Sequence, residues 1–533
     1  MAVSFRENSF QQIALSDKIF NMTDRENKAL KNSWAYIFAE EIFPCIDEKR
    51  FAVLYSDVAS RPNTPVNVCV GALIIKELFD HSDDEMVENL MLDIRYQYAL
   101  HTTSFAEQPL SDKTLSRFRK RCYDYETLHG IDLFHECVKN LGEKIAKMMQ
   151  LNGRIRRMDS MMIEANIKNL SRMELVYTCI AKLARYLKKH QPDLLPEEME
   201  HYNDPEDYNR IFYHMKQEDV QGQRQILLND MELLLKNCDT GFEDVTEYEL
   251  FLRCVCEQTC VEEGKRRFCS KEDKQLNSRS MSNPSDPEAT YRKKGEGHRG
   301  YIANLEETLG KTGSFITDYE YEQNIYADQQ FMKDRLEELP KQEESMLLIT
   351  DGGYYSIENT ELAEKKNIEL RTTGLTGKDA KDILNEFEYS EDQRKVEKCP
   401  AGYKPRSSCY IEANERIKVT FSRAQCEGCP HKEQCRPKMF KRTARIFIYS
   451  TGIKRAQLQR KIGSEQYRDY VRLRNGIETV PSNLRRNYHL EKLPRGKKRG
   501  KFFFGCKIAA LNFRKLYNYR KGLGNYAPNP LLA

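Results

Sequence analysis

The chain has 533 residues, a hydrophobic fraction of 40%, a charged fraction of 31% and a net charge of +4. This length predicts two to four domains of about 100–200 residues, and the composition is typical of a globular protein with a polar surface. No run of about 18 apolar residues occurs, which argues against a membrane span. Residues 1–8 lack the apolar core of a signal peptide, so we expect a cytoplasmic protein whose 16 cysteines are free thiols or metal ligands.

The first 150 residues carry the patterns of several short helices. Ser82–Glu85 has the spacing of a capping box, and a later helix is predicted to begin near Ser111. Short helices that end in a basic one resemble a helix-turn-helix, whose second helix enters the major groove of DNA. A helix bundle with a charged outer face explains the pattern equally well. The basic residues of this last helix are Arg117, Arg119, Lys120 and Arg121.

A strand that carries one acidic residue is predicted from Arg154 to Ile163. Its alternate residues share one face, and Asp159 lies in the middle of that face. Burying a carboxylate there is costly unless a divalent metal or a partner arginine neutralises it. A hydrogen-bonded structural aspartate is the alternative.

Residues from about 170 to 275 return to a helical pattern. The four cysteines in this stretch have a spacing that matches a zinc site poorly, so we expect core or surface thiols. They are Cys254, Cys256, Cys260 and Cys269. A turn-rich link at 283–287 follows, and short strands are predicted at 300–305 and 314–318.

A second acidic residue follows a short apolar run. Residues 346–349 are consecutively apolar, which indicates a strand buried on both faces, as in a parallel arrangement. Asp351 comes at its carboxyl end, and Gly352 and Gly353 permit a tight turn and the close approach of a ligand. A turn aspartate that caps the next helix is the alternative. The next strand is predicted at 367–373.

A cysteine-rich segment occupies residues 378–440. Cys426 and Cys429 have the two-residue gap of a zinc knuckle, and Cys399 and Cys435 could complete four thiolates. Cys409 or His431 could substitute for one of them. Such a site has no open position for water, so it would be structural; reduced free thiols are the alternative.

A third acidic residue, Glu478, lies four residues after Arg474, so the two share a helical face. Pro481 is expected to bend or restart this helix. An exposed ion pair is the simplest interpretation of the two residues.

Residues 485–521 contain 13 Lys or Arg and one acidic residue, a net charge of +12, which leaves −8 for the rest of the chain. Such a block suggests a polyanion, most plausibly nucleic acid, because aromatic residues interleave the charges. A solvated basic tail is the alternative. The basic residues that we single out for DNA contact are Arg485, Arg486, Lys497, Lys498 and Arg499, together with Arg474.

Three acids in this order suit phosphoryl transfer on DNA. Two Mg²⁺ ions about 3.5–4 Å apart can clamp the attacking and leaving oxygens, and few carboxylates suffice to hold them. The motifs at 158–166, 351–356 and 474–485, with the helices from about Glu48 to Arg121 and the cysteine segment, resemble the DDE transposases of bacterial insertion sequences. Three departures from the family stand out. Val471 occupies the position of a family tyrosine, with Tyr470 beside it, and Ile302 follows Gly300 and Tyr301 where the family often has lysine. Some relatives use a tryptophan to hold a flipped base during hairpin cleavage, but the only tryptophan here is Trp34.

The resemblance implies an α/β fold: an RNase H-like mixed sheet with helical and Cys-rich insertions, preceded by an all-α N-terminal domain. It implies catalysis by Asp159, Asp351 and Glu478, with Mg²⁺ or Mn²⁺ held by these acids, and a possible structural Zn²⁺. The expected partners are double-stranded DNA, at transposon inverted repeats and at the target, and a second copy in a homodimer, with no membrane partner. We expect the protein in the bacterial cytoplasm, associated with the nucleoid.

The expected domains are a helical DNA-binding or dimerisation domain at 1–150 and a first core part at 151–377, with its helical insertion at about 170–280. The Cys-rich insertion at 378–440 and the end of the core at 441–533 follow. Two other functions stay open: a transposase-derived DNA-binding protein that does not cleave, and an RNase H-like nuclease without strand transfer. A zinc-dependent regulator would leave the three acids unexplained.

Overall fold

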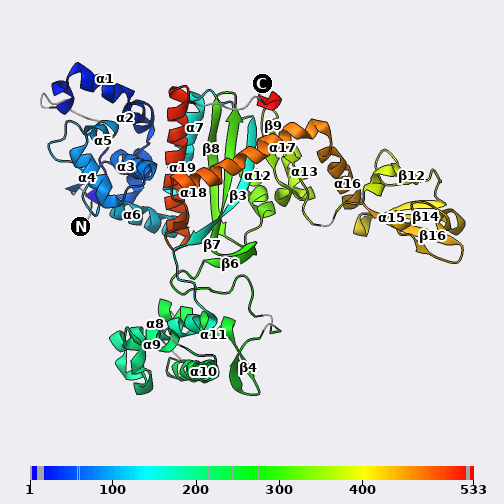
Figure 1. Ribbon diagram of the computed structural model, residues 1–533, viewed down its shortest axis with the longest axis horizontal. Helices are drawn as coiled ribbons and strands as arrows, with labels where there is room; N and C mark the ends of the chain where they lie inside the picture. The colour runs from blue at the N-terminus through cyan, green and yellow to red at the C-terminus, as the bar shows by residue number, and fades with distance from the viewer. Residues whose placement is uncertain are drawn as a thin grey trace.

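The computed structural model describes residues 3–8, 17–56, 58, 61–213, 215–238, 241–242, 244–270, 272–273, 275–377, 379–523 and 529–532. The chain folds around a central mixed sheet, with helices on both of its faces and two separate insertions projecting from it (Figure 1). Within these residues, no helix is both long and apolar enough to cross a membrane.

The central sheet has five main strands. They are β3 (Ile155–Ala165), β7 (Glu296–Gly310), β8 (Gly313–Gln323), β9 (Met346–Thr350) and β10 (Ile368–Thr372). Their order is β10-β9-β3-β7-β8, with β3, β9 and β10 parallel and β7 antiparallel to both of its neighbours. This is the strand order of an RNase H-like sheet, so the predicted fold class is confirmed. Two short strands add to the sheet: β6 (Thr290–Lys294) pairs with the first residues of β7, and β17 (Lys492–Leu493) pairs with the last residues of β3.

Strands β7 and β8 are longer than the two short strands that the sequence predicts. They form one antiparallel hairpin that closes through Gly310 and Gly313. The mixed polar and apolar sequence hides their length, because many polar side chains in them are buried in ion pairs. Glu306 and Glu307, for example, are 1% and 0% exposed.

Each face of the sheet is covered by different helices. Met158, Ile302 and Leu348 pack under α12 (Asp328–Glu338) and α13 (Ile357–Lys365). Met161, Ile163 and the β8 tyrosines pack on the opposite side, under α7 (Leu133–Met148) and α19 (Lys497–Arg520). Asp159 has the same parity as Met161, so it lies on this second face, as the alternation predicts.

Helix α19 corrects the expectation of a basic tail. The helix packs lengthwise on β8 and α7, and Gly500 and Gly505 let it pass the rings of Tyr321 and Tyr319, which any side chain at these positions would strike. The interleaved aromatic residues, such as Phe502, Phe504 and Phe513, are therefore core residues. Their spacing serves packing and does not make a stacking surface for bases.

The N-terminal region is helical, and it shares one hydrophobic core with α19 and the sheet. Trp34 belongs to this core, where its ring meets those of Phe38, Phe79 and Tyr96. The capping box predicted at Ser82 is present at the start of α4. The helices are α1 (Asp24–Asn32), α2 (Trp34–Ile37), α3 (Val66–Phe79), α4 (Asp83–Leu92), α5 (Ile94–Ala99) and α6 (Thr114–His129), beside the short paired strands β1 (Val3–Ser4) and β2 (Arg61–Pro62).

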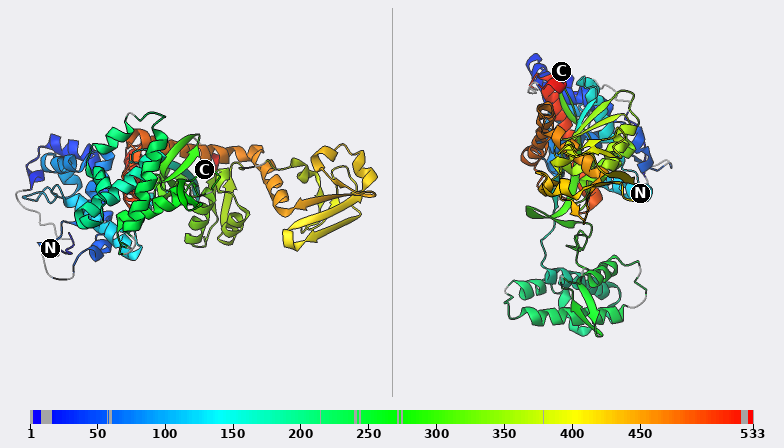
Figure 2. Two further views of the ribbon diagram at one scale, coloured as in Figure 1. Left: turned by 90° about the horizontal axis from the view of Figure 1, so that it is seen from below. Right: turned by 90° about the vertical axis from the view of Figure 1, so that its right-hand side faces the viewer.

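The first insertion leaves the sheet after β3 and returns at β6. It has its own hydrophobic core, and it hangs below the sheet on two chain segments (Figures 1 and 2). The side-chain amide of Asn283 donates to the carbonyl of Lys168 at 2.8 Å, so the two ends of the insertion meet. Its elements are α8 (Arg172–His190), α9 (Asp207–Phe212), α10 (Val220–Asn237), α11 (Thr246–Gln258), β4 (Thr259–Glu262) and β5 (Lys265–Phe268).

The second insertion is a small β-rich unit at the far end of the molecule (Figure 1). It has a four-stranded antiparallel sheet in the order β13-β14-β16-β15, which continues to Tyr449, beyond the boundary expected at 440. Its strands are β11 (Glu388–Tyr389), β12 (Val396–Lys398), β13 (Ser407–Ile411), β14 (Arg416–Ser422), β15 (Lys438–Met439) and β16 (Thr443–Tyr449), with α14 (Arg423–Glu427) and α15 (Lys432–Cys435). Helix α16 (Ser450–Ile462) then leads back to α17 (Arg468–Asn475) and α18 (Thr479–Asn487) at the sheet.

Candidate active site

The structure brings the three predicted acids together around one arginine. Arg474 Nη2 lies 3.3 Å from Oδ2 of Asp159 and 3.6 Å from Oδ2 of Asp351. Its Nη1 contacts Oε1 of Glu478. We call Asp159, Asp351 and Glu478 the acid cluster. Three carboxylates face one guanidinium, so the cluster carries excess negative charge when all three are ionised.

Sheet register puts the first two acids at the same level. Strands β3 and β9 are parallel neighbours, with Arg157 opposite Ile349, so two residues further along each strand are Asp159 and Asp351. Asp351 ends its strand because Gly352 turns against the backbone of Gly374, where a Cβ would come within 2.6 Å. The carboxylate of Asp351 then accepts a hydrogen bond from the Gly353 amide at 2.7 Å.

The third acid lies in a break between two helices. Glu478 is the last residue of a short 3₁₀ turn, Gly476–Glu478, that separates α17 from α18. Pro481 lies in the first turn of α18, where a missing amide proton costs nothing, so the helix restarts as expected. The side chain of Glu478 is 62% exposed, against 14% for Asp159, so the cluster opens to solvent on its Glu478 side.

Burial and like charges act together on Asp159. Burial raises the pKa of Asp159 to about 6, and the nearby carboxylates of Asp351 and Glu478 add to this, against the guanidinium of Arg474 and the amide of Ser160. Burial lowers the pKa of Arg474, but the carboxylates around it outweigh burial and hold that pKa above its usual value. The acid cluster therefore stabilises a cation strongly.

Arg474 was predicted to contact phosphates, and the structure corrects this. Its side chain is 14% exposed and its guanidinium faces the acid cluster. The i, i+4 spacing from Arg474 to Glu478 brings the two together, as the sequence indicates. The other two partners of Arg474 are Asp159 and Asp351, which lie more than 100 residues away in the chain.

Two residues near the site were missed by the sequence-based reasoning. Arg157, two residues before Asp159, is buried, pairs with Glu307 at 2.6 Å and donates to the carbonyl of Leu473 at the end of α17. It thus ties the helix that carries Arg474 to the strand that carries Asp159. An arginine on the inward face of a strand was the available signal.

Asp328, the first residue of α12, is the second missed residue. Its carboxylate accepts a hydrogen bond from Ser160 Oγ at 2.8 Å. Gly353 lies between the carboxylates of Asp328 and Asp351, and a Cβ on that glycine would lie within 3.0 Å of both. Asp328 is thus a fourth acid beside the cluster. Nothing in the local sequence marks it.

An open cleft of about 760 Å³ adjoins the acid cluster. Asp159 and Glu478 line it together with Arg485 and Arg486, both exposed on α18, and His298. The cleft joins the acids to basic side chains that were predicted to contact DNA.

Of the other residues predicted to contact DNA, some are exposed to solvent and others are engaged by neighbouring side chains. Arg117 and Arg499 are exposed, as is Lys120, which pairs with Asp124 at 2.7 Å. Arg119 is a correction: it is buried, contacts Asp83 and lies over the ring of Phe503 at 5.2 Å.

Three more of these residues are partly engaged. Arg121 lies 4.7 Å from the centroid of the Tyr55 ring. Lys497 pairs with Glu322 at 2.6 Å, and Lys498 donates to Thr127 Oγ1 at 2.8 Å. Within the same basic block, Lys507 is buried and pairs with Glu77 at 2.6 Å. Much of the positive charge of residues 485–521 therefore neutralises internal carboxylates.

The predicted zinc ligands line one small cavity. Cys399, Cys426, Cys429 and Cys435, with His431, surround about 20 Å³ beside the second insertion's sheet. Burial and the neighbouring thiols raise the pKa of Cys435 to about 11. Cys409 lies exposed on β13 and is absent from the lining of this cavity, so it does not serve as a substitute ligand.

The cysteines of the first insertion stay apart from that cavity. Cys254 is buried and Cys256 exposed. Cys260, Cys269 and Asp273 have ligand atoms within 4.8 Å of one another, but the Asp273 carboxylate is held by Arg267 at 2.9 Å. Cys260 and Cys269 thus lie at the hairpin of β4 and β5, beside the ion pair of Arg267 and Asp273.

Two family models match the chain. One is described as a transposase DDE domain and matches residues 398–517; the other is described as a transposase domain and matches residues 24–121. Both matches indicate a DDE-type transposase. Glu478 and Arg474 lie inside the first match, and Asp159 and Asp351 lie outside both. A transposase DDE domain supports a DNA-cleaving enzyme and implies dependence on a divalent metal ion.

No curated protein matches the chain. Among solved structures, the cryo-EM structure of the piggyBac transposase synaptic complex with hairpin DNA is similar, with 9% identity and a TM-score of 0.31 over 94% of this chain and 77% of that chain.

Proposed function

We propose that the transposase cuts DNA at transposon ends and joins the freed 3′ ends to target DNA, with Asp159, Asp351 and Glu478 as its catalytic acids and Mg²⁺ as its metal. Mn²⁺ is expected to substitute. The observation that carries the proposal is the convergence of these three carboxylates, from β3, the end of β9 and the turn before α18, on one guanidinium.

The residues of the acid cluster fit a hard divalent cation. The donors are carboxylate oxygens, which Mg²⁺ prefers, and the cluster has excess negative charge, which adds to the effect of burial in raising the pKa of Asp159. When bound, divalent ions supply an activated nucleophile and neutralise charge on the leaving oxygen. Asp159 and Asp351 would hold them, with Glu478 completing the site.

The protein side chains around the acids position the reacting groups. Arg157 fixes α17 against β3, so the distance between Glu478 and Asp159 depends on a buried ion pair. Arg485 and Arg486 line the cleft beside the acids and would bind the phosphates that flank the scissile bond. No serine or tyrosine nucleophile is required, because the chemistry forms no covalent protein intermediate.

The DNA partners that we propose are the inverted repeats at the transposon ends and the target duplex, bound by a homodimer. The proposal of DNA as a partner is supported by exposed cations, namely Arg117, Lys120, Arg485, Arg486 and Arg499. Each lost phosphate contact should lower the salt dependence of binding by about one unit.

The central test is cleavage of a labelled inverted-repeat duplex. Asp159→Ala, Asp351→Ala and Glu478→Ala should each abolish cutting in Mg²⁺ or Mn²⁺ and leave DNA binding largely intact. Ca²⁺ should support binding but little cutting. The matched control is Glu361→Ala, an acid exposed on α13, which should cut normally.

The outcomes separate the alternatives. Cutting by Asp351→Ala at the wild-type level, or cutting that a chelator does not affect, would contradict metal-dependent cleavage at the acid cluster. Binding of the inverted repeat without any cutting by the wild type would favour the DNA-binding protein that does not cleave. Cutting without joining to a target duplex would favour a nuclease.

We also propose that Cys399, Cys426, Cys429 and Cys435 hold a structural Zn²⁺. Four thiols around one small cavity repel one another once ionised, and a zinc ion removes that cost. Metal analysis of freshly purified, reduced protein should find about one zinc per chain, and Cys429→Ser should lose it whereas Cys409→Ser should retain it. Zinc-free protein with normal stability would rule this site out.

A further inference from the structure

The outer face of the second insertion's sheet carries a set of cations that the proposed function does not use. Alternate residues of β14 and β16 point to the insertion's own core: Ile417, Val419 and Phe421 of β14 are buried there. The residues between them lie on the opposite face. We call this set the outer face; it consists of Arg416, Lys418, Lys438, Arg445, Phe440, Phe447 and Tyr449.

Aromatic rings hold these cations in place. The Arg416 guanidinium lies 4.4 Å from the Phe447 ring centroid, and that of Arg445 lies 4.8 Å from the Phe440 centroid. Lys418 is directly opposite Phe447 in the ladder. Phe447 is 38% exposed and Tyr449 48%, which is unusual for large rings unless a partner covers them or they position other groups.

No carboxylate neutralises the outer face within the described part of the chain. Elsewhere in the same insertion, Arg394, Lys398 and Arg423 pair with Glu412, Glu388 and Glu427. Arg416, Lys418, Lys438 and Arg445 form no such pair among the described residues. A ring orients a cation without cancelling its charge, whereas a carboxylate does both. The outer face therefore presents pre-oriented and uncompensated positive charge.

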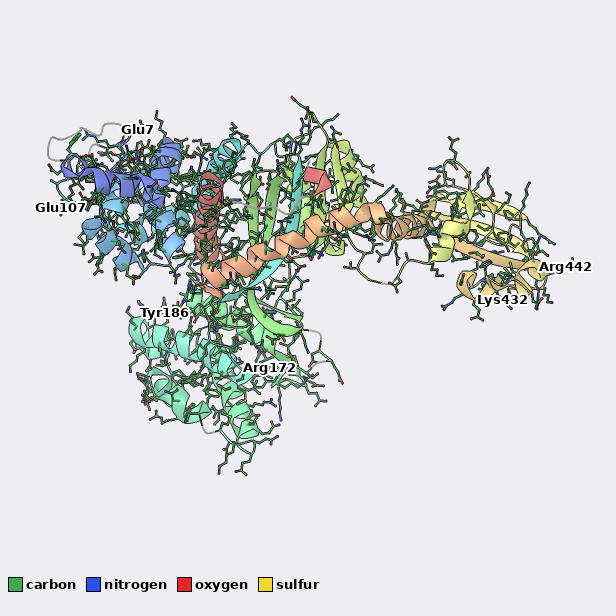
Figure 3. The ribbon with its side chains drawn as sticks, turned by 45° about the horizontal axis from the view of Figure 1, so that its top comes forward. Glu7, Glu107, Arg172, Tyr186, Lys432 and Arg442 are labelled. Atoms are coloured by element: carbon green, nitrogen blue, oxygen red, sulfur yellow. The ribbon has the colours of Figure 1, made fainter. Side chains whose placement is uncertain are left out.

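The charge is concentrated here. Residues 416–445 contain nine Lys or Arg against two acidic residues, a net charge of +7, whereas residues 172–282 of the first insertion contain 16 against 22, a net charge of −6. Lys432 and Arg442, labelled in Figure 3, lie at the outer end of the second insertion, far from the central sheet. The two insertions thus differ in the sign of their fields.

We propose that the outer face binds double-stranded DNA through its phosphates, away from the acid cluster and without reading base sequence. This inference rests on the proposed function, since it supplies a second grip on the DNA that the acid cluster cuts. Duplex DNA presents one negative charge per about 1.7 Å of its axis, so a sheet face with uncompensated cations on neighbouring strands should attract it. The face carries Arg and Lys and no Asn or Gln, which fits backbone contact rather than base readout.

The projection of the insertion fits duplex DNA rather than an unpaired strand. Helix α16 carries this unit outward from α17 and the sheet (Figures 1 and 2), so DNA that reaches it lies beyond the strands at the acid cluster. DNA at that distance from a cut is base-paired. The rings are then supports for the cations, and they do not need to stack on bases.

The experiment measures binding of the full chain to a labelled duplex without transposon ends, over a series of salt concentrations. The test variant is Lys418→Gln/Lys438→Gln/Arg445→Gln. The matched control, Lys189→Gln/Lys236→Gln/Lys265→Gln, removes the same charge from exposed positions of the first insertion. The test variant should lower the slope of log K against log salt by about 0.9 for each lost contact, and the control should keep the wild-type slope.

A second variant tests whether the aromatic rings orient the cations, independently of the charge that the cations contribute. Phe447→Leu keeps an apolar side chain and every cation, so it should keep the wild-type slope while weakening binding about two- to fivefold, as expected for the loss of an exposed cation–π contact. A wild-type slope in the triple variant overturns the inference. So does an equal loss in the control, or a triple variant that changes self-association of the chain and leaves the salt slope alone.

End cleavage by the wild-type protein is followed in parallel. Wild-type protein that binds the duplex with the expected slope but never cuts an inverted repeat refutes the proposed function and leaves the outer face intact as a DNA contact. Cutting by the wild type together with an unchanged slope in the triple variant refutes only the outer face.

Discussion

At the scale of single residues, the site depends on a buried ion network behind it. Glu307 is fully buried in β7 and is contacted by Arg157 at 2.6 Å and Lys515 at 2.7 Å, with Ser314 donating to it. Burial raises the pKa of Glu307, but Lys515 and Arg157 outweigh burial and lower it to about 2. The same Arg157 holds α17, so the carboxylate that stabilises the fold also fixes the position of the helix that carries Arg474.

The ion network predicts a pH-dependent stability. Because the pKa of Glu307 in the folded protein is below its unfolded value of 4.5, its contribution is complete above about pH 4.5 and is lost as the pH falls towards 2. Glu307→Gln should lower the free energy of unfolding at pH 7 by about 3 kcal/mol, since it leaves two buried cations uncompensated. Denaturant unfolding at pH 7 and at pH 3 should show the difference from wild type shrinking at the lower pH. Glu337→Gln, at an exposed position of α12, should show no such effect; a constant difference at all pH values would contradict the assignment.

At the scale of elements, the turn between α17 and α18 determines where Glu478 lies. Asp159 and Asp351 belong to neighbouring parallel strands, so their relation is fixed by the sheet. Glu478 has no such support, and its 3₁₀ turn reaches the sheet because Gly476 packs directly on the guanidinium of Arg157. The turn is therefore the adjustable part of the acid cluster.

A methyl group in this turn should displace Glu478. A Cβ at residue 476 would collide with Arg157 Nη1, whereas the backbone there is helical and accepts alanine. Gly476→Ala should reduce end cleavage by at least about tenfold, the effect of a displacement near 1 Å in a positioned site, and leave duplex binding near wild type. Gly463→Ala is the control, because its Cβ would meet nothing closer than 3.7 Å. Normal cleavage by Gly476→Ala would show that the turn moves freely.

The sequence predicts strands correctly where the period of its hydrophobic residues agrees with the faces that are buried. Alternation in residues 155–163 and the apolar run before Asp351 predict β3 and β9, and the structure confirms both strands. The basic block fails because the partners of its lysines are remote: Lys507 pairs with Glu77 and Lys515 with Glu307, 430 and 208 residues away. Local composition cannot distinguish a cation that binds DNA from one that neutralises a buried acid. Asp328 was missed for the same reason, since its neighbours Ser160 and Gly353 belong to β3 and to the turn after β9.

At the scale of the whole molecule, the two insertions are independent of the sheet to different degrees. The first has a separate hydrophobic core, and its entry and exit meet at Lys168 and Asn283. The second connects to the sheet through α16 and the segment after β10 (Figure 1). The N-terminal helices, in contrast, share one core with α19 and the central sheet.

Removal of the first insertion should leave the rest folded. Replacing residues 170–282 with a short Gly-Ser bridge should preserve cooperative unfolding and binding to the inverted repeat, because the two ends already lie within hydrogen-bond distance. Circular dichroism melting and duplex binding measure this. A protein that lacks α7, residues 133–148, is the comparison and should not fold, since α7 packs on β8 and α19. Aggregation of the first variant would show that the insertion supports the sheet.

The position of α19 has a consequence for how the molecule is made. Phe513 packs on Phe38 and Phe502 on Phe134, so a helix from the last part of the chain fills the space between the earliest helices and the sheet. Chains are synthesised from the N-terminus, and early segments fold as they emerge. Until residues 497–520 leave the ribosome, the N-terminal helices therefore keep an apolar surface uncovered. The shared core is therefore completed only after residues 497–520 have emerged, so a nascent chain that has not yet passed α19 cannot hold its N-terminal helices against the sheet.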